Sequence, residues 1–549
     1  MTEPLAETPD TVGAYPRLSE QQIADLAEYG ERRSTVRGDV LFQEGDTESV
    51  FFVVLAGHVA VVDGYQTDQE RLISVHGPGR FLGELGLFTG QPTFVTAVVR
   101  EPGEVLAVPV QRLRTLVTQV PSLGDLILRA CLIRRSILIG LGTGMRIIGS
   151  RYSPDTRRLR DFVARNRLPY RWIDLERDRW AERMLRDLGV TPQDTPVVVC
   201  SSGKVLRNPS NAELARAVGL PVPAAPPESS DLIVVGAGPA GLATAVYAAS
   251  EGLSTVVLDA IATGGQAGTS PRIENYLGFP AGISGAELAE LAAIQAAKFG
   301  AKMAVPAEAT GLVEDSGRHQ VRLDNGTTLT TRTVVVATGV KYRQLEVPGL
   351  TEYAGGSVYY AATLAEAQLC RGDPVAIVGG GNSAGQAAVF LAQYAPQVHL
   401  LVRSGDLGKD MSRYLVDQVW RHPAIRVMTH TEVREPIGTG EGLYALVVED
   451  NRTGERREIP ARALFVFIGA APRTGWLAEA LALDERGYVR TGTDAQSPDH
   501  RPDWLPLMLE TSRPGVFAAG DVRRGSVKRV ASAVGEGAMA VRMVHERMG

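Results

Sequence analysis

Two glycine-rich segments constrain this chain most, because each stands between a run of apolar residues and a run of small ones. The first reads DLIVVGAGPAG from residue 231, and the second reads VAIVGGGNSA from residue 375. The glycines and the alanine of these two turns are Gly236, Gly238, Gly241, Gly379, Gly381 and Ala384. A strand that enters a helix through G-x-G-x-x-G or G-x-G-x-x-A is typical of a dinucleotide-binding turn, whose glycines let the backbone approach a pyrophosphate. We therefore predict an α/β protein with two Rossmann-like nucleotide-binding domains.

The residue at the end of the next strand distinguishes the two turns. Asp259 lies 23 residues after Gly236, and Arg403 lies 24 residues after Gly379. An acid at this place binds the free hydroxyls of a ribose, whereas an arginine suits a 2′-phosphate. We therefore predict FAD at the first turn and NADPH at the second. A surface arginine solvated by water is the alternative interpretation of Arg403.

Length and composition exclude several other classes of protein. At 549 residues the chain is long enough for about three or four domains, and its formal net charge of -5 argues against a nucleic-acid binder. The apolar stretch at residues 136–144 is too short to span a bilayer, and the polar start is no signal peptide. We expect a cytoplasmic protein without a membrane span, whose partners are small molecules and proteins.

The three cysteines, Cys131, Cys200 and Cys370, are far apart in the sequence. The chain has no CxxC, and no cysteine and histidine residues have the spacing of metal ligands. We therefore expect no metal site, and we expect each cysteine to be a small buried apolar residue.

Residues 1–144 have the pattern of a small β-roll. We expect a short helix at residues 20–29, strands at 50–55, 57–62 and 71–75, and helical structure at 110–141. The segment FLGELGLFTGQP from residue 81 resembles the phosphate-binding cassette of cyclic-nucleotide-binding domains. The resemblance implies that Glu84 contacts a ribose hydroxyl. Thr93 stands where that family has the arginine that binds the cyclic phosphate.

Without that arginine, a buried phosphate would lack its bidentate partner, a loss of about 2–5 kcal/mol. Binding of a cyclic nucleotide at Glu84 is one interpretation of this domain. A structural or dimerising β-roll and a β-roll with a different ligand are the alternatives.

Residues 145–220 alternate strands and helices. Strands are expected at 146–150, 170–175 and 196–200, and a helix at 156–165. This order resembles a glutaredoxin-type thioredoxin fold, and the resemblance implies a cis bond between Thr195 and Pro196. The tetrapeptide SPDT from Ser153 to Thr156 stands where that family has its CxxC, so no thiolate is available there for disulfide exchange. We interpret this module as a docking or spacer domain, followed by a proline-rich linker at residues 221–230.

The rest of the chain, residues 231–549, resembles the low-molecular-weight thioredoxin reductases over essentially its whole length. The matching segments are GGQ at 264–266, IENYLGFP at 273–280, ATG at 337–339 and GVFAAGD at 515–521. The resemblance implies an FAD-binding domain formed by residues 231–349 and 470–549, with an NADPH-binding domain inserted at residues 350–469. By analogy with relatives of the first and last modules, we also expect a homodimer.

The resemblance also implies cofactor contacts for particular residues. FAD is expected to contact the first turn, with Asp259 at the ribose, and further residues expected around it are Gly265, Gln266, Asn275, Thr338, Gly339, Gly520, Asp521, Arg529 and Ala531. NADPH is expected to contact the second turn, which includes Asn382 and Ser383, and Arg403 is expected at the 2′-phosphate. The family has two adjacent arginines at that last place, whereas Ser404 follows Arg403 here.

In those reductases a CxxC follows a tyrosine shortly before the second glycine turn. Alignment on GSVYY at 356–360 puts Ala361 and Leu364 at the two cysteine positions, and Cys370 has no partner nearby in the sequence. We therefore predict hydride transfer from NADPH to FAD and then direct delivery of electrons to an external acceptor, without an internal redox disulfide.

The acceptor is left open among flavodoxin, ferredoxin, a quinone, dioxygen and a protein disulfide docked on the flavin. Some cysteine-free relatives of thioredoxin reductase act as ferredoxin reductases, which offers a precedent for one of these classes. The alternative function is a sensor of redox or nucleotide state whose catalysis is vestigial.

Overall fold

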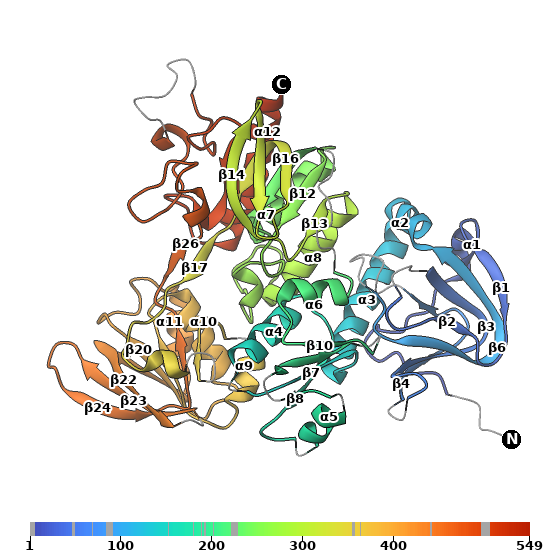
Figure 1. Ribbon diagram of the computed structural model, residues 1–549, viewed down its shortest axis with the longest axis horizontal. Coiled ribbons are helices and arrows are strands. Elements are labelled where there is room, and N and C mark those ends of the chain that lie inside the picture. The colour runs from blue at the N-terminus through green and yellow to red at the C-terminus, as the bar shows by residue number, and fades with distance from the viewer. Residues whose placement is uncertain are drawn as a thin grey trace. The chain divides into compact units, whose positions relative to one another are not determined.

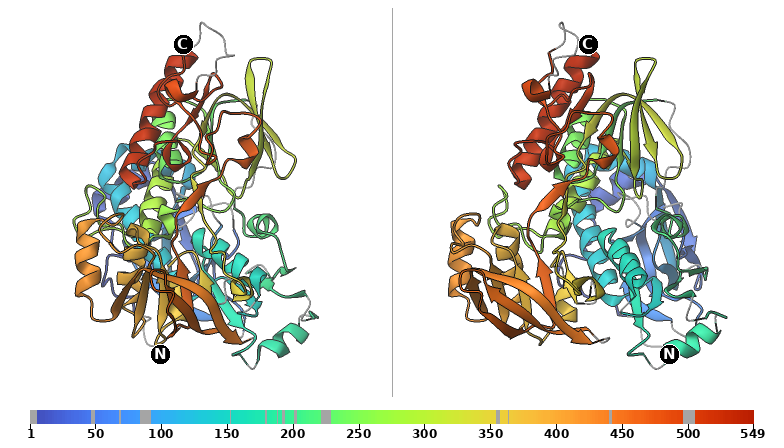
Figure 2. Two further views of the ribbon diagram at one scale, coloured as in Figure 1. Left: turned by 90° about the vertical axis from the view of Figure 1, so that its left-hand side faces the viewer. Right: turned by 60° about the vertical axis from the view of Figure 1, so that its left-hand side comes forward.

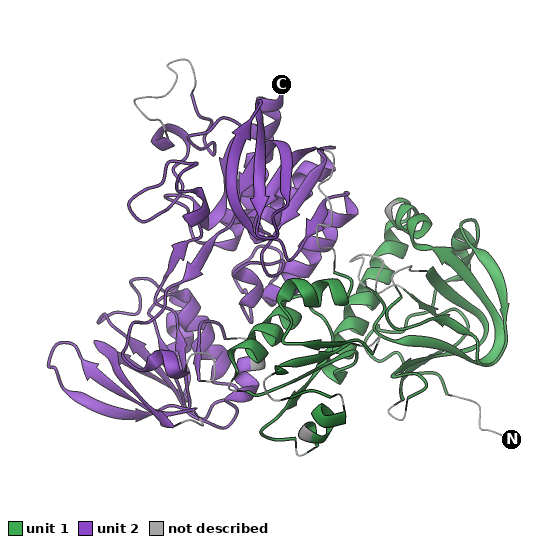
Figure 3. Ribbon diagram, in the orientation of Figure 1, with its two compact units in different colours: residues 1–222 green, residues 223–549 purple. Residues whose placement is uncertain are grey.

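The computed structural model describes residues 6–46, 50–67, 70–83, 92–151, 153–178, 180–187, 189–191, 194–200, 203–220, 229–353, 357–362, 364–439, 442–495 and 505–549. The chain divides into two compact units, Met1–Val222 (unit 1) and Pro223–Gly549 (unit 2), which Figure 3 colours separately. Both units mix helices and strands (Figure 1), which confirms the predicted α/β class.

An antiparallel sheet forms the first part of unit 1. Its strands are β1 Glu31–Thr35, β2 Val40–Phe42, β3 Val50–Asp63, β4 Arg71–His76, β5 Phe81–Leu82 and β6 Thr96–Pro109. They pair in the order β1-β6-β3-β4, with β2 on β6 and β5 on β3. The helices of this part are α1 Glu20–Ala27, α2 Val110–Gln119 and α3 Pro121–Leu141. Apolar side chains of the long strands pack on these helices around the fully buried Phe51, Leu113 and Ile127.

Two details of this domain differ from the sequence prediction. The strands expected at 50–55 and 57–62 are one strand, β3, because Gly57 (φ +79°) makes an irregularity in the ladder beside Glu101 and does not turn the chain. The helical structure expected at 110–141 is two helices. Pro121 has no amide hydrogen to continue α2 and instead begins α3.

The second part of unit 1 is a four-stranded sheet with three helices. Its elements in chain order are β7 Met145–Gly149, α4 Pro154–Arg165, β8 Tyr170–Asp174, α5 Ala181–Asp187, β9 Val197–Val199, β10 Val205–Arg207 and α6 Asn211–Ala217. The strand order is β10-β9-β7-β8, with β7 parallel to β8 and antiparallel to β9. The bond between Thr195 and Pro196 is cis, as predicted.

The largest sheet of unit 2 combines residues from both ends of that unit. Its strands are β11 Ser230–Val235, β12 Thr255–Leu258, β13 Lys302–Ala304, β14 Ala309–Asp315, β15 Arg318–Leu323, β16 Thr328–Val336 and β27 Val516–Ala518, the last of which pairs with β16. One face packs on helices α7 Pro239–Ser250, α8 Gly285–Lys298 and α12 Val530–Met548. The central strands are therefore apolar on both faces, as buried parallel strands are.

Two further sheets lie between these segments in sequence. A five-stranded parallel sheet contains, in spatial order, β18 Val358–Tyr359, β25 Ala463–Val466, β19 Val375–Val378, β20 Val398–Val402 and β21 Ile425–Thr429. Helices α9 Leu364–Leu369, α10 Asn382–Leu391 and α11 Arg413–Arg421 accompany it. Its other face shares a core with the antiparallel strands β22 Thr431–Thr439, β23 Gly442–Asp450 and β24 Arg456–Pro460, drawn in orange in Figures 1 and 2.

A two-stranded ribbon carries the chain from the large sheet to the inserted sheets and back. Strands β17 Val340–Tyr342 and β26 Ala470–Pro472 pair antiparallel, with Tyr342 opposite Ala470. Because both crossings use this ribbon, residues at its ends lie near both glycine turns.

Among the described residues, no helix is both long enough and apolar enough to cross a bilayer. In the same residues, no three side chains of histidine, cysteine, aspartate or glutamate gather as a metal site would require.

A buried ion pair ties α12 to the loop before β27. Glu510 is 0% exposed, and Arg547 donates to both of its oxygens, through Nη2 to Oε2 at 2.6 Å and through Nε to Oε1 at 2.9 Å. We predict that Arg547→Met lowers the free energy of unfolding of unit 2 by about 3–5 kcal/mol, because it leaves a buried carboxylate unpaired. Urea unfolding followed by circular dichroism measures the change.

The control is Arg413→Met, which removes an exposed pair with Asp417 at 3.0 Å and is expected to cost less than about 1 kcal/mol. Equal losses in the two variants would contradict the role given to the buried pair.

Candidate active site

The first glycine turn joins β11 to α7 through a close backbone contact. A Cβ atom on Gly236 (φ +110°) would lie 2.3 Å from the carbonyl oxygen of Ala337, directly after β16. A Cβ on Gly241 would lie 1.8 Å from the carbonyl oxygen of Gly236. Glycine alone fits both positions, so the turn is pressed against the end of β16.

The helices that follow the two glycine turns begin without a side-chain cap. Gly238 is the N-cap of α7 and Gly381 is the N-cap of α10, and neither helix has a side-chain hydrogen bond at this end. By contrast, Ser284 caps α8 and accepts from Glu287. The first amides of α7 and α10 can therefore donate to a phosphate, where the helix dipole also favours negative charge. Both helix ends fit a pyrophosphate.

Asp259 is fixed beside the first turn by backbone amides. Its Oδ2 accepts from the amide of Ala237 at 2.9 Å, and its Oδ1 accepts from the amides of Ile261 and Ala262 at 3.0 and 3.2 Å. A carboxylate has about four acceptor positions. The side chain can therefore still accept a hydrogen bond from a ribose hydroxyl.

The loop at 264–266 lies against the same turn. A Cβ on Gly265 would be 2.9 Å from the Cα of Gly238, and Gln266 Nε2 donates to the carbonyl oxygen of Val340 at 3.2 Å. Asn275 is exposed on the following segment. The loop therefore runs from the first turn to the start of the ribbon.

The ATG segment after β16 reaches the returning strand of the ribbon. Thr338 Oγ1 donates to the carbonyl oxygen of Arg473 at 3.0 Å, and Gly339 adopts a left-handed conformation with φ +62°. Together with the loop at 264–266, this segment forms one side of the predicted FAD site.

The late GD motif packs directly on α7. A Cβ on Gly520 would be 2.9 Å from the Cβ of Ala240, and the amide of Gly520 donates to Glu536 at 2.7 Å. Burial raises the pKa of Asp521, and the charge of Lys528 lowers it. Asp521 is therefore a half-buried carboxyl beside the first helix turn of α7.

The start of α12 completes this side of the site. Arg529 is the N-cap residue of α12, its side chain is exposed, and its Nη1 donates to the carbonyl oxygen of Lys528 at 2.9 Å. Ala531, in the first turn of the helix, is exposed as well. Both predicted residues are thus open to a ligand.

The second glycine turn has the same construction as the first. A Cβ on Gly379 (φ +147°) would lie 2.4 Å from the carbonyl oxygen of Phe467 and 3.1 Å from the Cβ of the fully buried Ala384. Asn382 Oδ1 accepts from the amide of Ser412 at 2.6 Å, which holds the loop after β20 near the start of α10. Ser383 is exposed at this helix end.

Arg403 follows β20 directly and is exposed. Among the described residues its guanidinium forms no ion pair, while its carbonyl oxygen accepts from Asn451 at 3.1 Å. Lys409 follows in the same loop and is exposed too, whereas Arg413, the first residue of α11, pairs with Asp417 at 3.0 Å. The loop therefore presents cations at the place expected for a 2′-phosphate.

Tyr342, which the sequence analysis did not single out, stands between the two predicted sites. Burial and the charge of Asp521 raise the pKa of its phenol above the ordinary value, although a hydrogen bond with Ser383 acts in the opposite direction. Ser383 belongs to the second turn and Asp521 to the FAD side, so this tyrosine is in reach of both.

Tyr414 on α11 has a similar place. Burial raises the pKa of its phenol, the charge of Glu274 raises it further, and the charge of Arg529 lowers it. The spacing of the glycines in the sequence does not predict that either tyrosine lies at the site. The positions of Tyr342 and Tyr414 depend on how the inserted sheets pack against the large sheet.

The three cysteines are buried, as predicted, and none of them forms a disulfide. Burial raises the pKa of the Cys200 thiol, and the charge of Lys204 lowers it. Burial, together with the charges of Glu366 and Asp373, raises the pKa of Cys370 to about 12. Neither of these two thiols is poised to form a thiolate.

The two positions that align with the CxxC of the family, Ala361 and Leu364, come directly after β18 and at the first residue of α9. Tyr359, the last residue of β18, packs on Phe465 with ring centroids 5.2 Å apart, so it belongs to the core. Ala361 is half-buried. Leu364 begins α9, and its side chain lies outside the described part of the chain.

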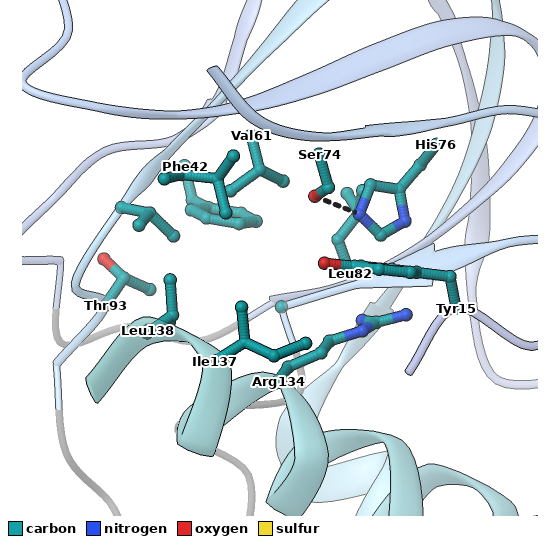
Figure 4. Close-up of a pocket in the computed structure, with 13 residues that line it drawn as sticks. Tyr15, Phe42, Val61, Ser74, His76, Leu82, Thr93, Arg134, Ile137 and Leu138 are labelled. Carbon is teal, nitrogen blue, oxygen red and sulfur yellow. Dashed lines mark hydrogen bonds between the residues drawn. The ribbon is translucent and has the colours of Figure 1, made fainter. Parts of the chain in front are cut away.

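Unit 1 contains a pocket inside the β-roll, shown in Figure 4. Ser74 and His76 lie at one end of it, joined by a hydrogen bond of 3.0 Å between Oγ and Nε2. Phe42 and Leu138 lie at the other end. Thr93 Oγ1 donates to the carbonyl oxygen of Gln43 at 2.5 Å, so its hydroxyl serves the backbone. Glu84 lies outside the described residues.

Two family models match the chain. The model described as pyridine nucleotide-disulphide oxidoreductase matches residues 230–537, more than half of the chain, and the chain belongs to this family. The model described as cyclic nucleotide-binding domain matches residues 32–120, which confirms the domain recognised from its sequence.

Known proteins similar to the chain point to one branch of that family. The chain is 34% identical to the thioredoxin reductase of Treponema pallidum (strain Nichols) over 311 residues, which are 56% of this chain and 94% of the relative. It is 30% identical over 327 residues to the "34.2 kDa protein in rubredoxin operon" of Clostridium pasteurianum, covering 58% of this chain and 97% of that protein. The crystal structure of T. acidophilum thioredoxin reductase superposes with a TM-score of 0.54 at 31% identity, covering 59% of this chain and 100% of that chain.

These findings confirm the predicted enzyme class. The chain is an FAD-dependent NAD(P)H oxidoreductase of the thioredoxin reductase type, and the cofactors of that type are FAD and NADPH.

The close contact between Gly241 and Gly236 leads to a testable prediction about the first turn. We predict that Gly241→Ala lowers the FAD content of the purified protein at least about tenfold, because a Cβ 1.8 Å from a carbonyl oxygen forces α7 away from β11. Flavin absorbance per mole of protein measures the content.

Gly535→Ala is the matched control, because this glycine lies in helix α12 with nothing within 4 Å of its Cβ position. It is expected to keep its FAD and to gain up to about 1 kcal/mol of stability. Loss of FAD in both variants would contradict the assignment.

Proposed function

We propose that the chain oxidises NADPH and passes the electrons to an external acceptor without an internal redox disulfide. The observation that carries this proposal is the state of its cysteines. Only three are present, none is spaced as a CxxC, and all three are buried outside any disulfide. A disulfide relay needs a thiolate both to attack and to leave, and Ala361 and Leu364 supply neither.

The first glycine turn is proposed to hold FAD, which when bound accepts a hydride from NADPH and releases the electrons to an acceptor. The uncapped end of α7 would bind its pyrophosphate, and Asp259 would accept from the ribose. Gln266, Thr338 and Asp521 would surround the rest of the molecule, at the point where the first turn meets the ribbon.

The second turn is proposed to hold NADPH through the amides at the start of α10, with Arg403 at the 2′-phosphate. Tyr342 would lie between the two cofactor sites, since its phenol is under the influence of both Ser383 and Asp521. We assign it the role of a positioning residue that excludes water from this junction.

The two parts of unit 1 are proposed to serve regulation and docking. Residues 145–220 are interpreted as a thioredoxin-like module without redox activity. Ser153 Oγ accepts from the amide of Thr156 at 3.2 Å and so caps α4, while the side chain of Thr156 is buried. Both residues thus have structural roles at the place where that fold has its thiols. Whether the β-roll binds a cyclic nucleotide at Glu84 stays a prediction.

Anaerobic mixing with NADPH tests the proposed reaction. We predict that saturating NADPH bleaches the flavin absorbance within the first seconds, because the reaction needs no group beyond the two cofactors and the residues that hold them. An unchanged spectrum would contradict the proposal and would favour a nucleotide sensor.

Replacement of all three cysteines by serine tests the absence of a sulfur relay. The triple variant is expected to be bleached by NADPH at the wild-type rate and to reduce a small acceptor such as ferricyanide at the wild-type rate. Turnover with a protein disulfide, measured on both proteins, is the second readout. A loss of turnover in the variant with intact bleaching would show that an internal thiol takes part.

Arg403→Ser tests the nucleotide preference. Removal of the guanidinium is expected to weaken NADPH binding at least about tenfold, equivalent to about 1.4 kcal/mol, and to leave NADH binding unchanged. Fluorescence titration gives both dissociation constants. Arg457→Ser, at an exposed cation of β24, is the control, and an equal effect there would overturn the role of Arg403.

A further inference from the structure

We propose that a group of cations beside the ribbon docks a small acidic protein that carries one electron at a time. The group, here called the cationic rim, consists of Lys341, Arg343, Arg473, Lys528 and Arg529. This inference rests on the proposed function, because it names the class of acceptor that would take the electrons.

The rim residues come together although they belong to three separate segments. Lys341 pairs with Ala471 across the ribbon. The amide of Arg343 donates to Gly469 at 3.0 Å, and the amide of Arg473 donates to Gly339 at 3.2 Å. All three therefore lie along the two paired strands.

The third segment joins the ribbon through Tyr488. Lys528 Nζ donates to the hydroxyl of Tyr488 at 3.1 Å, and that hydroxyl donates to the carbonyl oxygen of Ala470 at 3.4 Å. Arg529 is the next residue and donates to the carbonyl oxygen of Lys528. The start of α12 is thereby held against β26.

The rim borders the proposed FAD site. Val340, next to Lys341, accepts from Gln266, and Thr338 donates to Arg473. The charge of Lys528 acts on Asp521. An acceptor held by the rim would therefore stand beside the residues assigned to the cofactor.

The side chains of the rim cations are exposed. Among the described residues, none of the five forms an ion pair, whereas Arg413, Arg434 and Arg456 of the same unit each have an acidic partner within 3.1 Å. The segments 339–346, 469–474 and 527–530 contain these five cations and one acid, Glu346, a net charge of 5 − 1 = +4. The whole chain has a formal net charge of -5, so the positive charge is local.

An apolar side chain stands among these charges. Val527 directly precedes the two cations of the third segment and is 61% exposed. A small apolar contact with charges around it is suited to a transient complex, in which complementary charge raises the rate of encounter.

The chemistry of the chain favours a one-electron protein among the acceptors. Such a carrier needs no thiol from this chain. The balance is NADPH plus two oxidised carriers giving NADP⁺, two reduced carriers and one proton. Dioxygen and a neutral quinone are not attracted by fixed cations, so the rim would not serve them. An acidic carrier would be attracted at long range at low ionic strength.

A binding measurement with the full chain tests the proposal. The probe is an oxidised acidic [2Fe–2S] ferredoxin, and a basic cytochrome c of similar size is the probe of opposite charge. We expect ferredoxin to bind at about 0.02 M salt and at least about tenfold more weakly at about 0.2 M salt, where the screening length is near 10 Å or less. Cytochrome c is expected not to bind.

The variant Lys341→Glu/Arg343→Glu/Arg473→Glu reverses three rim charges; it spares Arg529, which is assigned to the cofactor, and Lys528, which binds Tyr488 and acts on Asp521. It is expected to weaken ferredoxin binding at least about tenfold, with its FAD content and its bleaching by NADPH unchanged. The matched control Lys298→Glu/Lys302→Glu/Arg322→Glu changes three exposed cations of α8, β13 and β15 and is expected to bind as the wild type does.

The proposal is overturned if the two triple variants bind ferredoxin equally, if salt has no effect, or if cytochrome c binds as well. Should the reversed variant lose its FAD, the same three positions changed to glutamine are measured instead, and wild-type affinity there overturns the proposal too. Failure of the wild type to bleach with NADPH refutes the proposed function, whereas bleaching with no ferredoxin affinity refutes the rim alone.

Discussion

The close backbone packing of helix α7 is the constraint on which the rest of unit 2 depends. A Cβ on Gly241 would be 1.8 Å from the carbonyl oxygen of Gly236, and a Cβ on Gly537 would be 2.2 Å from that of Ala240. The first contact sets α7 on strand β11, and the second sets α12 on α7. Because α12 begins shortly after Asp521, this packing brings the last motif of the chain to its first nucleotide turn.

The same constraint explains why so large an insertion is tolerated. Strand β27 pairs with β16, and α12 packs on α7, so the large sheet is complete without the inserted strands. The inserted sheets have a core of their own around Leu400 and Phe465. Only the geometry of the ribbon formed by β17 and β26 has to suit both the large sheet and the inserted sheets. That is why Tyr342 of the ribbon has neighbours in both predicted cofactor sites, Ser383 and Asp521.

The parts of the fold that were predictable are those set by local backbone requirements. The glycine turns and strand β12 follow from residue types at fixed spacing, whereas the cis bond before Pro196 was implied by the resemblance to a thioredoxin fold. The break between α2 and α3 at Pro121 was predictable as well, because a proline inside a helical run ends or starts a helix. The long apolar run at residues 110–141 nevertheless led to the prediction of continuous helical structure. Tyr414 could not be found in this way, since nothing local distinguishes it from a core tyrosine. The homodimer stays a prediction.

The loss of thiols has a physical consequence for the route of the electrons. On the proposed route no thiol of this chain carries the electrons, so the acceptor itself has to approach the cofactor. Recognition then falls to the residues that border the site, which here include the ribbon. A partner held by Lys341 and Arg343 would touch the ribbon that connects the large sheet to the inserted sheets, so acceptor binding on the proposed route would be coupled to the placement of the predicted NADPH site.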